Sequence, residues 1–77
     1  MVEAFVLIQT EIGKQLPVAT RVSRIHGVAT AVVVTGPYDV IARLTADDFD
    51  SLGKKVVSTI QAVDGVARTL TCPVVHL

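Results

Sequence analysis

Two charged side chains four positions apart, Asp39 and Arg43, are the clearest candidates for chemistry in this sequence. They fall in a segment of strand-like composition, where residues four apart lie about 13 Å apart in an extended chain. That separation is too long for a direct ion pair, but a zwitterionic small molecule held between subunits could satisfy both groups. Ordinary ion pairs between subunits, completed by water, would satisfy them equally. The residues alone favour the ion pairs.

The other reactive residue types form no catalytic or metal-binding pattern. His26, His76 and the single cysteine, Cys72, lack the spacing of metal ligands, and one cysteine cannot complete a zinc or CxxC site. The acidic cluster in Asp47–Asp50 precedes a helical pattern and is typical of a helix start. Since the sequence shows no nucleophile–base set and no glycine-rich phosphate loop, it predicts no enzyme, no cofactor and no metal site.

The elements that must position these residues follow from hydrophobic periodicity. Four runs have the composition and length of strands, and two stretches repeat apolar residues every three or four positions, as helices do. Gly27 and Gly65 should end the two helices. The first run, apolar on both faces, should lie centrally, whereas Pro73 places the last run at a sheet edge. In chain order we predict strand Val2–Gln9, helix Lys14–Ile25, strand Val28–Thr35, strand Tyr38–Thr45, helix Phe49–Val63 capped by Asp47, and strand Val66–Val75.

The order β-α-β-β-α-β predicts an α+β fold of the ferredoxin-like type. Such a fold has a four-stranded antiparallel sheet with both helices on one face. A weak internal repeat agrees with it, because Val22–Val28 and Thr59–Val66 each run from a helix end through glycine to a strand that begins with valine. We therefore expect two βαβ halves joined by a hairpin.

Alternation along the strands assigns side chains to the face under the helices or to the open face. The second strand is ambiguous, because both of its sets are small and apolar: either Ala29, Ala31, Val33 and Thr35 or their complement faces outward. For the last two strands, the covered set is predicted as Tyr38, Val40, Ala42, Leu44, Leu70, Cys72 and Val74, and the open set as Asp39, Ile41, Arg43, Thr45, Ala67, Thr69 and Thr71.

The composition predicts a single domain over residues 1–77 that needs partners. Hydrophobic residues make up 51% of the chain and aromatic residues only 4%, so the excess is aliphatic. A domain this small cannot hide so much aliphatic surface inside itself. We expect a homodimer or a higher homo-oligomer.

The charges argue against two classes of partner. Basic and acidic residues balance at 7 each and form no basic run, so direct nucleic-acid binding lacks its electrostatic basis. No apolar stretch approaches the roughly 20 residues of a membrane span. Glu3 lies where a signal peptide would be basic, and a lone cysteine fits a reducing compartment. We therefore expect a soluble cytoplasmic protein.

Three segments carry a resemblance to a known family: Ile25–Val28 (IHGV), Val34–Val40 (VTGPYDV) and Val63–Thr69 (VDGVART). They resemble the sensing domain of Lrp/AsnC transcription regulators. In that family a helix ends before a valine-led strand, and a Thr/Ser-Gly-x-Tyr/Phe-Asp turn follows. The resemblance covers essentially the whole chain.

This resemblance implies dimers packed sheet to sheet, often assembled into larger rings, with amino acids or related small metabolites bound between subunits near the turn. By position, Gly36, Tyr38 and Asp39 match the binding turn, and Thr69 and Thr71 match the strand that lines the pocket. It implies that Asp39 takes the ligand ammonium and that backbone N–H groups of the turn take its carboxylate.

The chain departs from the family pattern in two respects. It starts directly at the first strand, without the family's helix-turn-helix domain, and Pro37 and Pro73 stand where the family often has backbone donors. We therefore expect no direct DNA binding by residues 1–77. The leading hypothesis is an oligomeric amino-acid or metabolite sensing domain that acts alone or through a full-length regulator. The alternatives are a ligand-free assembly module that forms mixed oligomers with such a regulator, and a small ferredoxin-like enzyme that uses Tyr38.

Overall fold

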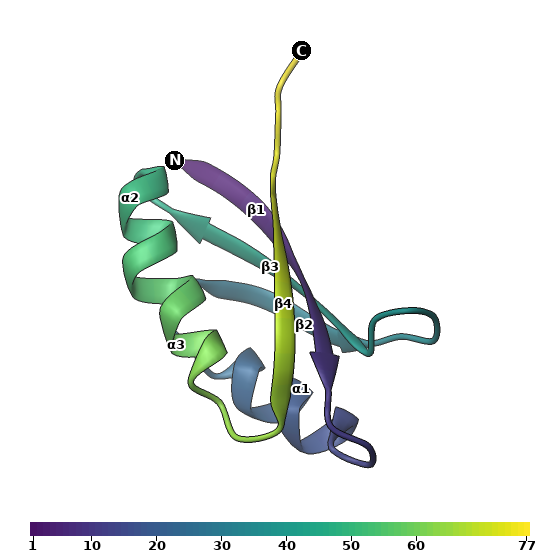
Figure 1. Ribbon diagram of the computed structural model, residues 1–77. Helices are drawn as coiled ribbons and strands as arrows, with labels where there is room; N and C mark the ends of the chain where they lie inside the picture. The colour runs from purple at the N-terminus through teal and green to yellow at the C-terminus, as the bar shows by residue number, and fades with distance from the viewer.

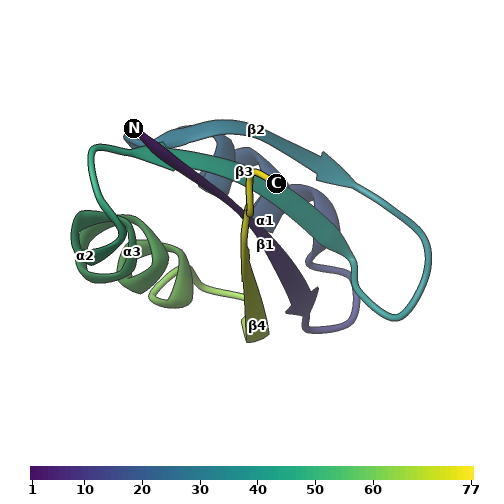
Figure 2. The same ribbon diagram turned by 90° about the horizontal axis from the view of Figure 1, so that it is seen from above.

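The computed structural model describes all 77 residues and contains one four-stranded antiparallel sheet (Figure 1). The strand order β2-β3-β1-β4 puts β1 inside the sheet and β4 at an edge, as predicted. The helical segments lie together on one side of the sheet (Figure 2), which confirms the ferredoxin-like βαββαβ fold. The elements are β1 (Val2–Thr10), α1 (Gln15–Ser23), β2 (Val28–Val33), β3 (Val40–Ala46), α2 (Phe49–Ser51), η1 (Leu52–Val57), α3 (Ser58–Gln61) and β4 (Val66–Pro73).

The loop between β2 and β3 is longer than the predicted turn. β2 ends at Val33, two residues before the predicted end at Thr35, and β3 begins at Val40, two residues after the predicted start at Tyr38. Pro37 explains the difference, because proline has no N–H with which to continue the ladder between the strands.

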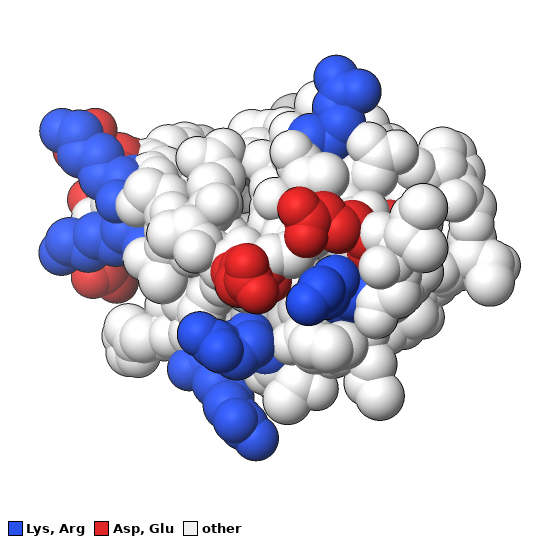
Figure 3. All heavy atoms as spheres, turned by 60° about the horizontal axis from the view of Figure 1, so that its bottom comes forward, with Lys and Arg blue, Asp and Glu red and all other residues white.

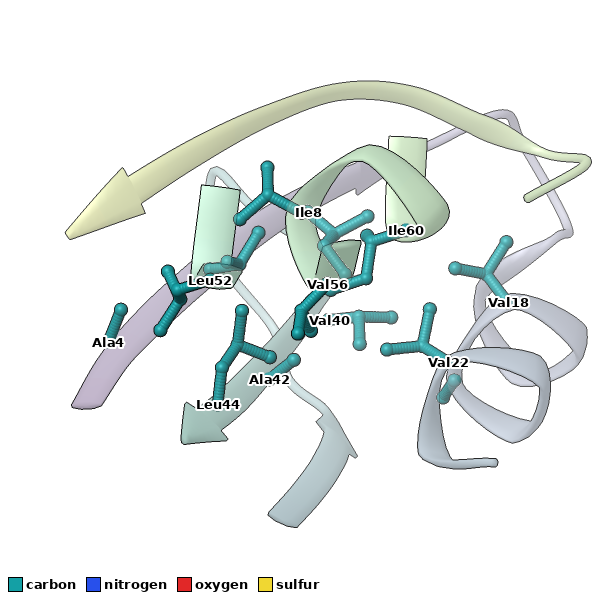
Figure 4. Close-up of a cluster of buried hydrophobic side chains, with 13 residues drawn as sticks. Ala4, Ile8, Val18, Val22, Val40, Ala42, Leu44, Leu52, Val56 and Ile60 are labelled. Atoms are coloured by element: carbon teal, nitrogen blue, oxygen red, sulfur yellow. The ribbon is translucent and has the colours of Figure 1, made fainter. Parts of the chain in front are cut away.

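The core lies between the sheet and the helices and consists of small aliphatic side chains (Figure 4). Burying one valine, leucine or isoleucine contributes about 1.5–3 kcal/mol relative to leaving it exposed, so this cluster is the main source of stability. Every second residue of β1 and β3 enters it, as alternation predicts. The buried hydrophobic residues are Ala4, Val6, Ile8, Val18, Ala19, Val22, Val40, Ala42, Leu44, Leu52, Val56, Val57 and Ile60.

The second helix begins at Phe49, as predicted, but its N-cap lies one residue later than predicted. Asp48, not Asp47, is its N-cap: Asp48 has an extended backbone (φ −149°, ψ 168°), and its Oδ1 accepts a hydrogen bond from Ser51 N at 2.7 Å. This bond from the Ser51 N–H lowers the pKa of the Asp48 carboxyl. Phe49, predicted to start the buried stripe, is half exposed, and the stripe begins in effect at Leu52.

The middle of this helix, η1, is a π-helix with a wider turn than an α-helix. The hydroxyls of Ser58 and Thr59 donate to the carbonyls of Lys54 and Lys55, four residues earlier. Such bonds compete with the backbone ladder and distort a helix. Gly53, which lies in the same segment, removes the side-chain restraint that would oppose the distortion.

Both halves of the fold use the same connection from helix to strand. Gly27 (φ +100°) and Gly65 (φ +95°) each follow a helix, which confirms the predicted glycine stops. The carbonyl of each glycine then accepts a bond from the neighbouring half: Thr45 N donates to Gly27 at 2.9 Å, and Glu11 N donates to Gly65 at 2.8 Å.

A β-bulge at Ala67 reverses the predicted faces of β4. Val66 pairs with Thr10 and Arg68 pairs with Gln9, so Ala67 is an extra residue in the strand. From Arg68 onward each side chain therefore points to the opposite face from the one that regular alternation assigns.

Thr69 and Thr71 consequently lie on the face under the helices, because each pairs directly with a β1 residue whose side chain is buried there. The prediction that these threonines lie on the open face is wrong. Leu70 and Cys72, predicted to be covered, lie on the open face instead.

The second strand carries the same irregularity, with Ala29 as its extra residue. After this bulge, Thr30 and Val32 lie on the open face, and Ala31 and Val33 lie on the helix-covered face, because their β3 partners do. The ambiguity of the sequence pattern at β2 is thus resolved by a shift in register rather than by either regular set.

Candidate ligand site at the β2–β3 loop

The loop that joins β2 and β3 projects from the body of the domain (Figure 1). Its base is closed by a bond from Val34 N to the carbonyl of Asp39 at 2.9 Å, and Asp39 N donates to Ile8 O on β1 at 2.9 Å. Gly36 has φ +140°, and nothing lies within 4 Å of the point where its Cβ would stand. Glycine is therefore required here by the backbone conformation and leaves an open approach to the loop.

The carboxylate of Asp39 is held by the end of β1. Its Oδ2 accepts hydrogen bonds from Thr10 N at 2.8 Å and from Thr10 Oγ1 at 3.3 Å. No group of the chain donates to its Oδ1. Asp39 therefore has a structural role at the base of the loop and retains one oxygen for a further donor.

Thr10 is a site residue that the sequence reasoning missed. Its backbone and side chain both position Asp39, and only 9% of its surface is exposed. The signal was present: Thr10 continues the alternation of Ala4, Val6 and Ile8, so a polar side chain occupies a covered position and needs a partner.

The structure brings only part of the predicted site together. Gly36, Tyr38 and Asp39 share the loop, and Tyr38 is half-buried outside β3 rather than within it. Thr69 lies on the far side of β1, where its Oγ1 accepts a bond from Gln61 Nε2 at 3.1 Å, and Thr71 lies two residues further along β4.

The open face of the sheet carries a row of aliphatic side chains that crosses all four strands. Val32 pairs with Ile41, Ile41 with Leu7, and Leu7 with Leu70, so the four residues are direct neighbours on one face. Val32 is 51% exposed and Leu70 48% exposed. Phe5, in the next row, is 40% exposed. A continuous apolar surface of this kind is typical of a contact between proteins.

Arg43, on the same face, has its charge matched within the chain. Its Nη1 lies 2.7 Å from Glu3 Oε2, and both side chains are partly exposed. An ion pair of this exposure contributes about 0–1 kcal/mol. Arg43 and Asp39 thus each have a partner within the chain, and the predicted pairing of the two through a ligand is not needed to satisfy Arg43.

Acidic and basic side chains are interspersed on the molecular face drawn in Figure 3, without a broad area of either sign. This distribution fits the formal net charge of zero. No group of three or more His, Cys, Asp or Glu side chains could hold a metal ion. None of the helices has both the length and the apolar character needed to cross a membrane.

The profile of the Lrp/AsnC ligand binding domain matches residues 3–76, nearly the whole chain. The chain belongs to this family. An HTH-type transcriptional regulator of Pyrococcus furiosus is 31% identical over 71 residues, which are 88% of this chain and 47% of that protein. The chain spans about half the length of the curated relatives that it matches. Because those relatives are transcriptional regulators, the Lrp/AsnC resemblance is confirmed and the family is a regulatory one.

Solved structures share the fold of this chain. TTHA0845 from Thermus thermophilus superimposes with a TM-score of 0.91 and 31% identity, over 100% of this chain and 96% of that chain. The transcriptional regulator NMB0573 from Neisseria meningitidis, solved as a complex with L-Met, has a TM-score of 0.80 over 97% of this chain and 50% of its own. At 18% identity the latter shows a common fold alone.

Proposed function

We propose that this Lrp/AsnC domain binds an amino acid or a related small metabolite between subunits, beside the β2–β3 loop. The observation that carries the proposal is the geometry of that loop, which is exposed, projects from the domain and holds Asp39 with one carboxylate oxygen free. One chain builds only one wall of such a site, so a second subunit must supply the other. The L-Met complex of NMB0573, which has the same fold, supports an amino acid as the ligand class.

In this proposal Asp39 Oδ1 accepts a bond from the ligand ammonium. The backbone N–H groups of Gly36 and Tyr38 donate to no acceptor within the chain, and they are the donors for the ligand carboxylate. Thr69 and Thr71 face the helices, so they support the site through the packing of β4 rather than by direct contact.

The second subunit is a copy of the same chain that packs against the open face. The aliphatic row from Val32 to Leu70 supports this homodimer, because its two ends are half exposed in one chain and would be buried between two sheets. Larger rings, and mixed assembly with a full-length Lrp/AsnC regulator in the cytoplasm, would carry the ligand signal to transcription.

Isothermal titration calorimetry with the twenty amino acids at millimolar concentration tests the ligand. We expect heat from at least one of them, and weaker binding by Asp39→Asn, which keeps an acceptor for Thr10 but removes the charge. Loss of a charge-assisted bond costs about 1.5–3 kcal/mol, or roughly 10- to 150-fold in Kd. Asp64→Asn, an exposed carboxylate outside the loop, is the matched control. No heat and no thermal shift with any amino acid would contradict the proposal.

The bonds from Thr10 favour a second candidate, a ligand-free assembly module, because they give Asp39 a purely structural task. In that case, a full-length Lrp/AsnC regulator should capture this chain in a pull-down whose yield does not change with any amino acid. A yield that depends on an amino acid, and on Asp39, would exclude the assembly module.

A further inference from the structure

A second feature lies at the end of the domain opposite the β2–β3 loop. It is a hollow of about 400 Å³, within the range of roughly 300–1,000 Å³ typical of small-molecule sites. In Figure 1 this end carries the N-terminus and α2. The polar part of its lining comes from three separate segments: His26 and Gly27 after α1, Thr45 and Asp47 at the end of β3, and Ser51 and Lys55 of the second helix.

The lining offers hydrogen-bonding groups that the chain itself does not use. His26 and Gly27 are the middle residues of the turn closed by Val28 N and Ile25 O at 3.0 Å, and their own N–H groups donate to no acceptor within the chain.

The charges around the hollow are balanced. Lys55 supplies a cation and Asp47 an anion. Asp48 lies beside the hollow. The hydrogen bond from the Ser51 N–H is the main cause that lowers the pKa of its carboxyl, and the nearby Lys55 ammonium lowers it to a smaller extent. Complementary charges across an interface select a ligand, so a lining with one strong charge of each sign suits a molecule that also carries both.

The shape of the hollow depends on a close contact at Gly27. A Cβ at this position would lie 2.6 Å from Val56 Cγ2, in the π-helical segment η1. The equivalent glycine of the other half, Gly65, is buried, and the Lys14 side chain passes 3.1 Å from the position of its Cβ. The two halves therefore share one connection, but only Gly27 is partly exposed and lines a hollow, beside the segment where the helix widens. Short π-helical segments occur frequently at functional sites.

We propose that this hollow is a separate binding site for a small zwitterion of the α-amino acid type. Lys55 and the free N–H groups of His26 and Gly27 take the carboxylate, and Asp47 takes the ammonium. The site shares no residue with the β2–β3 loop, so ligand binding at the hollow can be tested independently of the function proposed above.

Two-dimensional ¹H–¹⁵N NMR of the whole chain tests this site, with glycine, acetate and methylammonium titrated separately at constant ionic strength. We expect saturable shifts of the His26, Gly27 and Ser51 amides with glycine, and at least tenfold weaker effects with acetate or methylammonium, each of which carries only one of the two charges. Lys55→Gln should weaken the glycine effect at least tenfold. Lys54→Gln is the matched control, because Lys54 pairs with Asp50 at 3.3 Å and does not line the hollow.

Three results would overturn the proposal: no saturable shift at the hollow up to about 100 mM of any probe, equal binding of acetate and glycine, or unchanged glycine binding by Lys55→Gln. Shifts confined to residues 34–39 and abolished by Asp39→Asn would support the loop site and remove this one. Shifts at the hollow that persist in Asp39→Asn would support the hollow as a separate site.

Discussion

Leu70 gives the sharpest test of the proposed homodimer, because the structure supplies a control with the same exposure. Leu70 and Val33 are both 48% exposed, and both lie on edge strands. Leu70 lies on the open face, whereas Val33 lies on the helix-covered face. If the open face is the dimer interface, truncation of Leu70 weakens the dimer and truncation of Val33 does not.

The expected size follows from burial. Fully burying a leucine contributes about 1.5–3 kcal/mol, so burying the exposed half of Leu70 contributes about 1 kcal/mol per subunit. Both copies of the residue lie in a twofold interface, so Leu70→Ala should cost about 2 kcal/mol per dimer. This corresponds to a rise of roughly 30-fold in the dimer Kd. Val33→Ala should leave the Kd unchanged within about twofold, since its side chain makes no contact with the partner.

Sedimentation velocity over a wide range of concentrations measures both dissociation constants, and thermal unfolding by circular dichroism shows whether each variant is folded. A folded Leu70→Ala variant with the same dimer Kd as the unsubstituted chain would refute the sheet-to-sheet interface. Equal weakening by Val33→Ala would also refute it, because the contact would then lie along the edge of the sheet and not on its open face.

Two further predictions concern the fold. Gly27→Ala should be more destabilising than Gly13→Ala by about 1–3 kcal/mol in urea unfolding. Both positions have positive φ, but only the Gly27 Cβ would collide with a neighbour, Val56. Equal losses of unfolding free energy in the two variants would contradict this reasoning. Asp48→Asn keeps an N-cap and removes its charge. The variant should therefore be less stable than the unsubstituted chain above pH 4, and this difference should vanish as the pH falls through the lowered pKa of Asp48. A difference in stability that is independent of pH between about 2 and 6 would show that the charge is irrelevant.

The fold could be predicted because each element has a strong local signal. Alternation in β1 and β3, the apolar stripes of the helices and the glycines that end them identified the elements and the covered face of β3. The faces of β4 could not be predicted in this way, since nothing in the types of Val66–Thr71 marks the bulge at Ala67. The bulge depends on the register with β1, which is a property of two strands together.

The two candidate sites also differ in how far the sequence could predict them. The loop at Gly36–Asp39 is contiguous in the sequence and was found from it. The bond from Thr10 to Asp39 joins residues 29 positions apart, and the hollow is lined by segments from separate parts of the chain, so no local motif identifies either.

The bulge at Ala67 takes one residue of β4 out of the ladder, so the faces of the residues that follow are set by their pairing with β1. Deleting that one residue would bring Val66 and Arg68 into direct succession opposite Thr10 and Gln9, so Leu70 would still face outward and Thr69 would still face the helices. The loss of this single codon would therefore remove the bulge without exchanging the aliphatic contact surface for a hydroxylated one. The bulge thus gives the contact surface of β4 a tolerance to the loss of one residue that a regular strand would not have.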